Sequence, residues 1–309
     1  MTGAPPPPQP VVAGDEAPAP RELMRGMRLL LLVAAGLVLL AGTQLFVFTE
    51  RTDEYFAWTI GNPLTAAFLG AAYWGSFVIE ALAARERRWA DARITVPTVL
   101  VFTVLTLAVT LAYLEVFHLG AEYGLNTQVV TWLWIAIYAV VPVLLIVVLV
   151  VQLRAPGTDP PRDAPPPRWL FVVIVAQALV MLLLGAWLFL DPLGVAAAVW
   201  PWDLTPLTGR AVGAWLLSFG VAASHAVVER DLRRLRPAGW GYLATGALQL
   251  VALVRYPDVP DGGSPRTWLY VAFLVSMLVV GATAVLGGRT VAGAGARERT
   301  RTDPASVDR

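Results

Sequence analysis

Residues 39–46, LLAGTQLF, return 143 positions later as residues 182–189, LLLGAWLF. The same shift aligns shorter matches along the chain, namely Pro63-Leu64-Thr65 with Pro206-Leu207-Thr208, Gly70 with Gly213, and Glu86-Arg87 with Glu229-Arg230. A self-match of this length predicts that the chain is an internal duplication, and the architecture must then be described as two copies of one unit.

The composition indicates a membrane protein. Of the 309 residues, 57% are hydrophobic and only 15% are charged, and the mean hydropathy is +0.64. A soluble chain of this size is more polar. There is no cysteine, which excludes disulfides and thiolate metal sites. The net charge of +1, with the arginines dispersed, predicts no nucleic-acid partner.

Eight apolar segments follow one another, and most have the ~20 residues that a helix needs to cross a bilayer. We therefore predict an all-α polytopic membrane protein with eight transmembrane helices. The expected spans are 29–48, 64–84, 95–117, 129–151, 170–190, 207–228, 240–254 and 268–286.

The arginines predict the orientation of these spans. Nineteen of the 23 basic residues precede the first span, follow an even-numbered span or lie in the C-terminal tail. We expect the protein to lie in the cell membrane, and the positive-inside rule then places both termini in the cytoplasm.

Four spans in each copy make the two repeats parallel, because the second copy enters the membrane in the same direction as the first. At a shift of 136, TWLWIA at 131–136 also matches TWLYVA at 267–272. The expected organisation is a disordered proline-rich cytoplasmic tail, a four-helix repeat, a proline-rich cytoplasmic linker, a second four-helix repeat and a disordered cytoplasmic tail, over 1–22, 23–154, 155–168, 169–289 and 290–309.

The most distinctive loop is the stretch 200–210, WPWDLTPLTGR. Thr205 followed by proline is a helix-start signal, as is Asn62 in the first copy. The simplest interpretation is that Trp200 and Trp202 anchor the helix at the membrane interface. The alternative is an anion site, in which the helix start and Arg210 hold a lipid phosphate or an anionic substrate. Asp203 weakens that alternative because it can neutralise Arg210.

Charged residues inside the spans form two further candidate pairs. Glu115 and Arg255 occupy roughly equivalent outer ends, where they either form an ion pair across the two copies or reach the interface separately. Glu80 and His225 lie near the inner ends of the second and sixth spans. They either relay protons or extend to the cytoplasmic surface.

No catalytic constellation, metal-ligand spacing or phosphate loop is apparent, so we expect no enzyme activity and no cofactor. The duplication resembles in principle that of major facilitator transporters, which have six spans in each half, and we assign no family. The leading hypothesis is a transporter or permease-like protein with a small-molecule or lipid path between the repeats. The alternative is a noncatalytic membrane scaffold or a partner subunit of a larger membrane complex. The expected partners are the lipid bilayer, an anionic lipid or small molecule, and another membrane protein.

Overall fold

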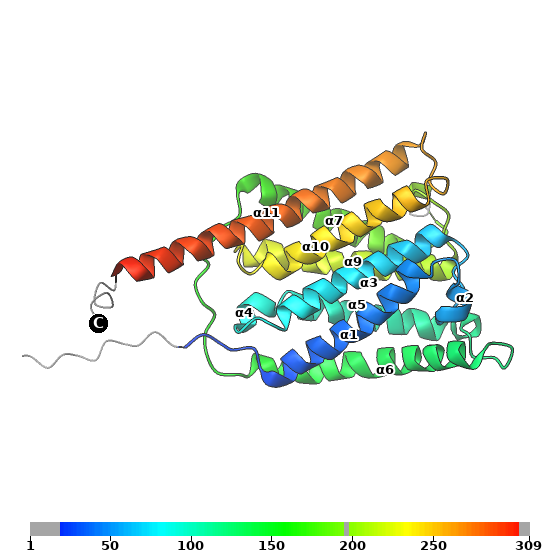
Figure 1. Cartoon of the computed structure of the whole chain (residues 1–309), viewed down its shortest axis with the longest axis horizontal. Helices are drawn as coiled ribbons and strands as arrows, with labels where there is room; N and C mark the ends of the chain where they lie inside the picture. The colour runs from blue at the N-terminus through cyan, green and yellow to red at the C-terminus, as the bar shows by residue number, and fades with distance from the viewer. Residues whose placement is uncertain (1–18, 195–197, 303–309) are drawn as a thin grey trace, which may run out of the picture.

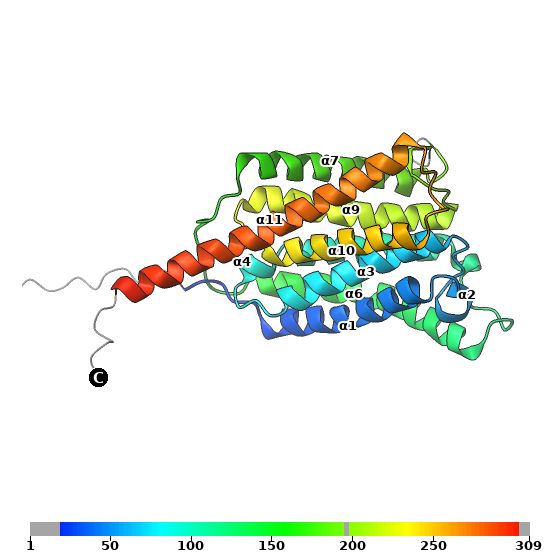
Figure 2. The same ribbon diagram turned by 45° about the horizontal axis from the view of Figure 1, so that its top comes forward.

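Eight long helices run side by side in the computed structural model, which describes residues 19–194 and 198–302 (Figures 1 and 2). They are α1 (Arg25–Val47), α3 (Pro63–Ala83), α5 (Thr95–Ala112), α6 (Leu125–Leu153), α7 (Arg168–Leu190), α9 (Pro206–Glu229), α10 (Arg236–Arg255) and α11 (Pro265–Thr302). The shorter elements are α2 (Thr52–Tyr55), α4 (Trp89–Ala92) and the 3₁₀ turn η1 (Leu114–Val116). Among the described residues, eight helices are long and apolar enough to span a membrane, which confirms the prediction of an all-helical membrane fold.

The first two spans of each half pack closely at a glycine. A Cβ on Gly70 of α3 would lie 2.5 Å from the backbone nitrogen of Phe46 in α1. A Cβ on Gly213 of α9 would lie 2.7 Å from the backbone nitrogen of Phe189 in α7. Only a residue without a side chain allows the two backbones to approach this closely.

The third span of each half packs on both halves. Helix α5 lies along α9, where the Ser218 hydroxyl donates a hydrogen bond to the Thr98 carbonyl at 3.2 Å. Helix α10 lies along α3, where Gly75 and Gly241 face each other. The two halves are therefore interleaved, and neither forms a separate four-helix bundle.

The predicted helix starts of α3 and α9 are confirmed. The Asn62 side chain accepts hydrogen bonds from the backbone of Leu64 and Thr65, and Pro63 is the first residue of the helix. Thr205 and Thr208 form a reciprocal capping box ahead of α9. These caps satisfy backbone groups that would otherwise lack partners at the helix start.

Both described ends of the chain lie at the same end of the bundle, here called the terminal end (Figure 1). The opposite end, called the far end, carries η1 and the loop before α9 (Figure 1). Two expectations for the tails need correction. Helix α11 continues to Thr302, whereas we expected no structure from residue 290. Extending an existing helix requires no new nucleation, and alanine, arginine and glutamate are good helix formers.

The second correction concerns the end of the N-terminal tail. Residues 1–18 and 303–309 lie outside the described residues. Arg21, which we expected to be disordered, donates its backbone N–H to the Thr158 carbonyl at 2.9 Å and accepts from Trp89 at 3.0 Å. These bonds hold residues 19–22 between the linker and the loop after α3. The partners are distant in sequence, so composition alone did not reveal them.

The spans themselves differ from the prediction at two places. The third was expected to reach residue 117, but α5 ends at Ala112 and the 3₁₀ turn follows. The seventh was expected over 240–254, yet α10 begins at Arg236, because Pro237 is favourable in the first helical turn. At 20 residues α10 reaches the usual spanning length.

Candidate functional site

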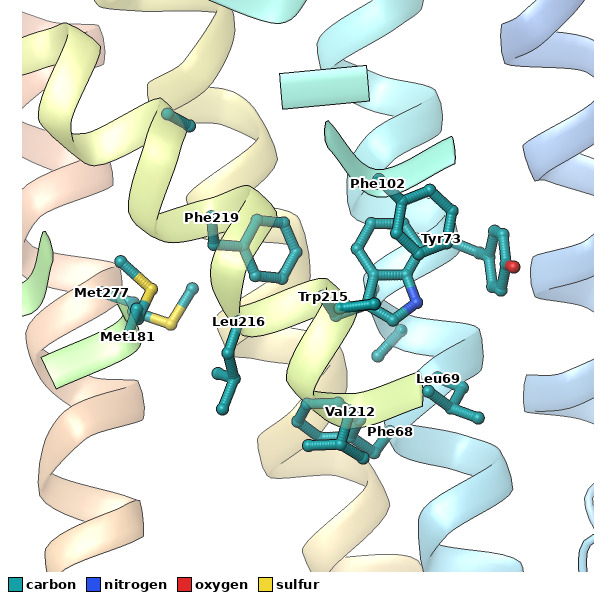
Figure 3. Close-up of a cluster of buried hydrophobic side chains, with 14 of the residues drawn as sticks. Phe68, Leu69, Tyr73, Phe102, Met181, Val212, Trp215, Leu216, Phe219 and Met277 are labelled. Atoms are coloured by element: carbon teal, nitrogen blue, oxygen red, sulfur yellow. The ribbon is translucent and has the colours of Figure 1, made fainter. Parts of the chain in front are cut away.

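A cavity of about 480 Å³ lies within the second half of the chain. Helices α7, α9, α10 and α11 and the loop before α9 form its walls, and Phe68 of α3 closes one side. Most of the lining is apolar. The apolar side chains include Val180, Met181, Leu216, Phe219, Leu274 and Met277. Figure 3 shows Met181, Met277, Leu216 and Phe219 gathered in one region of the interior. The volume and the lining are typical of a site for a small apolar or amphiphilic molecule.

The cavity opens toward the outer surface of the bundle between α7 and α11. Helix α7 packs mainly on α9, and α11 packs mainly on α10, so α7 and α11 meet over only a small area. Val180 of α7 and Leu269 of α11 line the cavity and are also 49% and 68% exposed. Hydrocarbon surrounds the outer faces of membrane-spanning helices, so these exposed lining side chains face lipid.

Few polar groups face this cavity. The Trp200 side chain is 3% exposed, and its indole nitrogen has no hydrogen-bond partner among the residues that the structure describes. At the rim, the Arg266 guanidinium donates to the Ala198 carbonyl at 2.8 Å. Deeper in the cavity, Ser276 accepts a hydrogen bond from Gln177 at 2.8 Å. A buried indole N–H without a partner is costly, and a hydrogen-bond acceptor on a ligand satisfies it.

The contact between the two halves is closely packed. Phe102 and Trp215 stack with ring centroids 3.8 Å apart, and Tyr73 meets Trp215 edge-on at 4.9 Å. Figure 3 shows these three rings grouped between α3, α5 and α9. The cavity beside them measures about 20 Å³, which leaves room for about one water molecule. A path between the halves is therefore closed in this conformation.

A second, smaller cavity of about 50 Å³ lies in the first half, between α1, α3, α5 and α6. Tyr73, Trp134 and Tyr138 occupy much of the surrounding space, and the two tyrosine hydroxyls are hydrogen-bonded at 2.7 Å. Glu80 also lines this cavity. The two halves thus enclose cavities of very different size.

The residues of the loop 200–210 have different surroundings in the structure. Arg210 donates to the Tyr113 hydroxyl, and its guanidinium lies over the Tyr113 ring at 5.4 Å from the centroid. Asp203 is exposed and forms no ion pair with Arg210. Arg210 therefore joins the start of α9 to the end of α5.

The two tryptophans of the same loop point inward. Trp202 is 5% exposed and donates its indole N–H to the Thr65 hydroxyl of α3 at 2.9 Å. Trp200 packs edge-on against Phe68, at 5.3 Å between ring centroids, and forms part of the cavity wall. We expected an interfacial anchor or an anion site, and the buried positions instead make these rings part of the core.

Glu115 and Arg255 do not meet. Glu115 is exposed in η1, whereas Arg255 donates to the Phe46 carbonyl at the end of α1 at 2.7 Å. Tyr256, the next residue, bonds the Thr49 hydroxyl. A cation at the C-terminal end of a helix is favourable, so Arg255 stabilises the contact of α10 with α1.

Glu80 and His225 have separate surroundings. Glu80 is fully buried and accepts a hydrogen bond from Ser76 at 2.8 Å, so it does not extend to the surface. The His225 ring nitrogen lies 3.6 Å from Glu229 in the same helix, and its side chain is 27% exposed. Glu80 and His225 form no hydrogen bond or ion pair with each other in the described part of the chain, and their polar partners differ.

A charged cluster that the sequence analysis missed lies at the terminal end. The Glu229 carboxylate is 1% exposed and binds two arginines. One is Arg93, which directly follows α4, and the other is Arg234, at 2.7 Å. Arg93 also binds Asp159 of the linker. Burial opposes the charge on Arg93, but the hydrogen bonds that Arg93 donates to Glu229 and Asp159, with the attraction of these carboxylates, outweigh it and raise the Arg93 pKa. The shift of 143 aligns Glu86 with Glu229 and so drew attention to this position. The sequence did not reveal which residues bind Glu229.

Among the residues described, no group of three histidine, cysteine, aspartate or glutamate side chains is arranged to hold a metal ion. The outer faces of the helices carry large exposed apolar side chains, including Leu29, Val143 and Leu183. Lipid is the environment that covers such surfaces without cost. The chain is a multi-pass membrane protein. Searches against protein-family models, curated proteins and solved structures found no match to it.

Proposed function

We propose that this protein is permease-like and takes an amphiphilic small molecule or lipid from the bilayer into the cavity of its second half. The cavity of about 480 Å³, open laterally between α7 and α11, is the observation that carries the proposal. Its lining is apolar, and Trp200 and Arg266 offer polar contacts near the far end. A single-chain amphiphile suits this arrangement, with its head near those two residues and its chain toward Met181 and Met277.

The proposal includes the tandem repeat, two parallel units of four spans with both termini in the cytoplasm. The terminal end is then the cytoplasmic one, because most of the arginines flank it. The two cavities support the repeat, because their walls use matching positions. At the shifts of 143 and 136, Val38, Tyr73, Trp134 and Tyr138 correspond to Met181, Leu216, Tyr270 and Leu274.

The same comparison gives a physical reason for the difference in volume. Tyrosines at 73 and 138 stand where the second half has Leu216 and Leu274, and a tryptophan at 134 stands where it has Tyr270. Larger side chains fill one cavity, while smaller ones leave the other open. A duplication, after which larger side chains filled the cavity of the first copy, accounts for a single ligand cavity in a protein with two copies of one unit.

The closely packed contact between the halves favours the alternative, a membrane scaffold or partner subunit without transport. A path through that contact requires the stacked rings of Phe102 and Trp215 to separate. We therefore assign the ligand path to the second-half cavity and not to the contact between the copies.

The test uses a palmitic acid that carries a photoactivatable diazirine, added to the full chain in lipid nanodiscs. Illumination should attach the probe to cavity residues, Met181 and Met277 among them, as mapped by peptide mass spectrometry. Filling the cavity with the double variant Leu216→Tyr/Leu274→Tyr should lower this labelling at least about tenfold.

The matched control is Leu179→Tyr/Leu183→Tyr, two positions on the exposed face of α7 that are 54% and 61% exposed. It should label like the unmodified protein. Equal labelling of the filled and control variants would contradict the ligand cavity and favour the scaffold alternative. Transport is tested separately by following the release of the same probe from proteoliposomes made of the same lipids as the nanodiscs.

A further inference from the structure

Glu80 is a buried acid in the last turn of α3 and forms no ion pair with any described residue. Its side chain is fully buried, and the Ser76 hydroxyl, one helical turn earlier, donates to Oε1 at 2.8 Å. The second carboxyl oxygen, Oε2, is buried and has no hydrogen-bond partner within 19–194 and 198–302. A carboxylate satisfied at one oxygen only is a rare arrangement in a buried region.

Glu80 lines the small first-half cavity of about 50 Å³. A volume of this size admits a few water molecules if polar groups hold them. Water in the cavity would give the unpartnered Oε2 both a hydrogen-bond partner and a route for proton exchange.

The groups that face Glu80 across the cavity carry no charge. They come from α1, α5 and α6 and from Tyr73, which lies about two turns before Glu80 in α3. The titratable ones are Tyr73 and Tyr138, which are hydrogen-bonded to each other. The Thr103 hydroxyl is engaged with the Leu100 carbonyl at 3.0 Å. No arginine or histidine lines the cavity. His225, the proton partner considered from the sequence, lies beside Glu229 instead.

An ionised carboxylate at such a position costs far more free energy than its neutral acid. We propose that Glu80 is a proton-binding site, held as the neutral acid in this conformation and exchanging its proton through the first-half cavity. Alanine occupies the corresponding position 223, so the site belongs to the first half alone. This proposal stands independently of the ligand of the second-half cavity.

The test is reaction with dicyclohexylcarbodiimide, an apolar reagent that enters membranes. The carboxyl proton passes to a carbodiimide nitrogen while the carboxyl oxygen bonds the central carbon, and the adduct rearranges to a stable N-acylurea. Peptide mass spectrometry of the full chain in membranes should find this adduct on Glu80 and not on the exposed Glu115. A water-soluble carbodiimide should give the opposite preference.

A second measurement does not depend on reagent access. Glu80→Gln keeps the shape and the Ser76 contact but binds no proton. In the native protein, unfolding exposes the acid and releases its proton, so raising the pH from about 5 to about 8 should lower the thermal midpoint. The Glu80→Gln midpoint should lack this part of the pH dependence. Identical pH dependence in both proteins, or no Glu80 adduct in the folded native chain, overturns the proposal.

Discussion

At the scale of single residues, hydrogen-bonding partners determine what each polar side chain does. Arg210, Arg255 and Glu115 looked like a set of functional charges, yet two of them bind neighbouring helices and the third is exposed. Trp200 and Thr245 both line the large cavity, and the indole nitrogen of one and the hydroxyl of the other have no hydrogen-bond partner among the described residues. The single residues most informative for function are therefore those whose hydrogen-bonding capacity is unmet.

His118 gives a prediction on pH dependence. Its ring bonds the Phe56 carbonyl at 3.0 Å and the Thr59 hydroxyl at 2.9 Å, and burial lowers its pKa from the ordinary 6.5. A lowered pKa in the folded state means that the unfolded chain binds the proton more readily. The stabilisation is thus present above pH ~6.5 and is lost as the pH falls below it.

We expect the thermal midpoint of the purified protein to fall between pH ~6.5 and pH ~5 through this residue. His118→Gln should be less stable at neutral pH and should lack that part of the fall, as followed by tryptophan fluorescence during heating. A His118→Gln protein with the full acid sensitivity of the native chain would disprove the assignment.

At the scale of helices, the close contacts were partly predictable. The shift of 143 aligns Gly70 with Gly213, and both lie where backbones meet. Gly36 also lies within a predicted span, yet a Cβ there has nothing within 4 Å. The neighbour of a helix depends on tertiary packing, which a single sequence does not reveal.

Gly213→Ala should lower the free energy of unfolding by about 1 to 3 kcal/mol, because its Cβ would strike the backbone of Phe189 in α7. Gly36→Ala is the matched control and should be neutral or slightly stabilising. Thermal unfolding in detergent compares the two variants. An unaffected Gly213→Ala protein would mean that α7 and α9 are not this closely packed.

The cluster around Glu229 joins α9, the linker and the loop after α4. Replacing Glu229 with glutamine leaves Arg93 and Arg234 together without their anion, and removing one partner of a buried pair costs about 3 to 5 kcal/mol. The exposed pair of Asp163 with Arg233 offers a control, because Asp163→Asn should cost less than about 1 kcal/mol. Equal losses for the two variants in chemical unfolding would contradict a buried cluster.

At the scale of the whole molecule, the sequence predicted the number and nature of the spans. It did not predict that α5 would pack on α9 and α10 on α3. Interleaving depends on contacts between residues that are more than 100 positions apart, such as Thr98 with Ser218, and no local pattern encodes them. The cavity was also unpredictable, because its walls come from four helices and a loop whose packing no local pattern encodes.

The orientation has a direct test, because the chain lacks cysteine. Single cysteines at Ala121 of the far end and Pro156 of the linker are both exposed. In intact cells an impermeant maleimide should label Ala121→Cys alone, and both variants should react once the membrane is permeabilised. Labelling of Pro156→Cys alone in intact cells would reverse the orientation.

The central claim is that one of two matching cavities holds a ligand from the bilayer. The most direct measurement is a cryo-electron microscopy map of the full chain in lipid nanodiscs, with no added ligand. We predict elongated density in the second-half cavity, running from Trp200 toward Met277, and no such density beside Tyr138. A map with well-resolved side chains and an empty or collapsed second-half cavity would contradict the account.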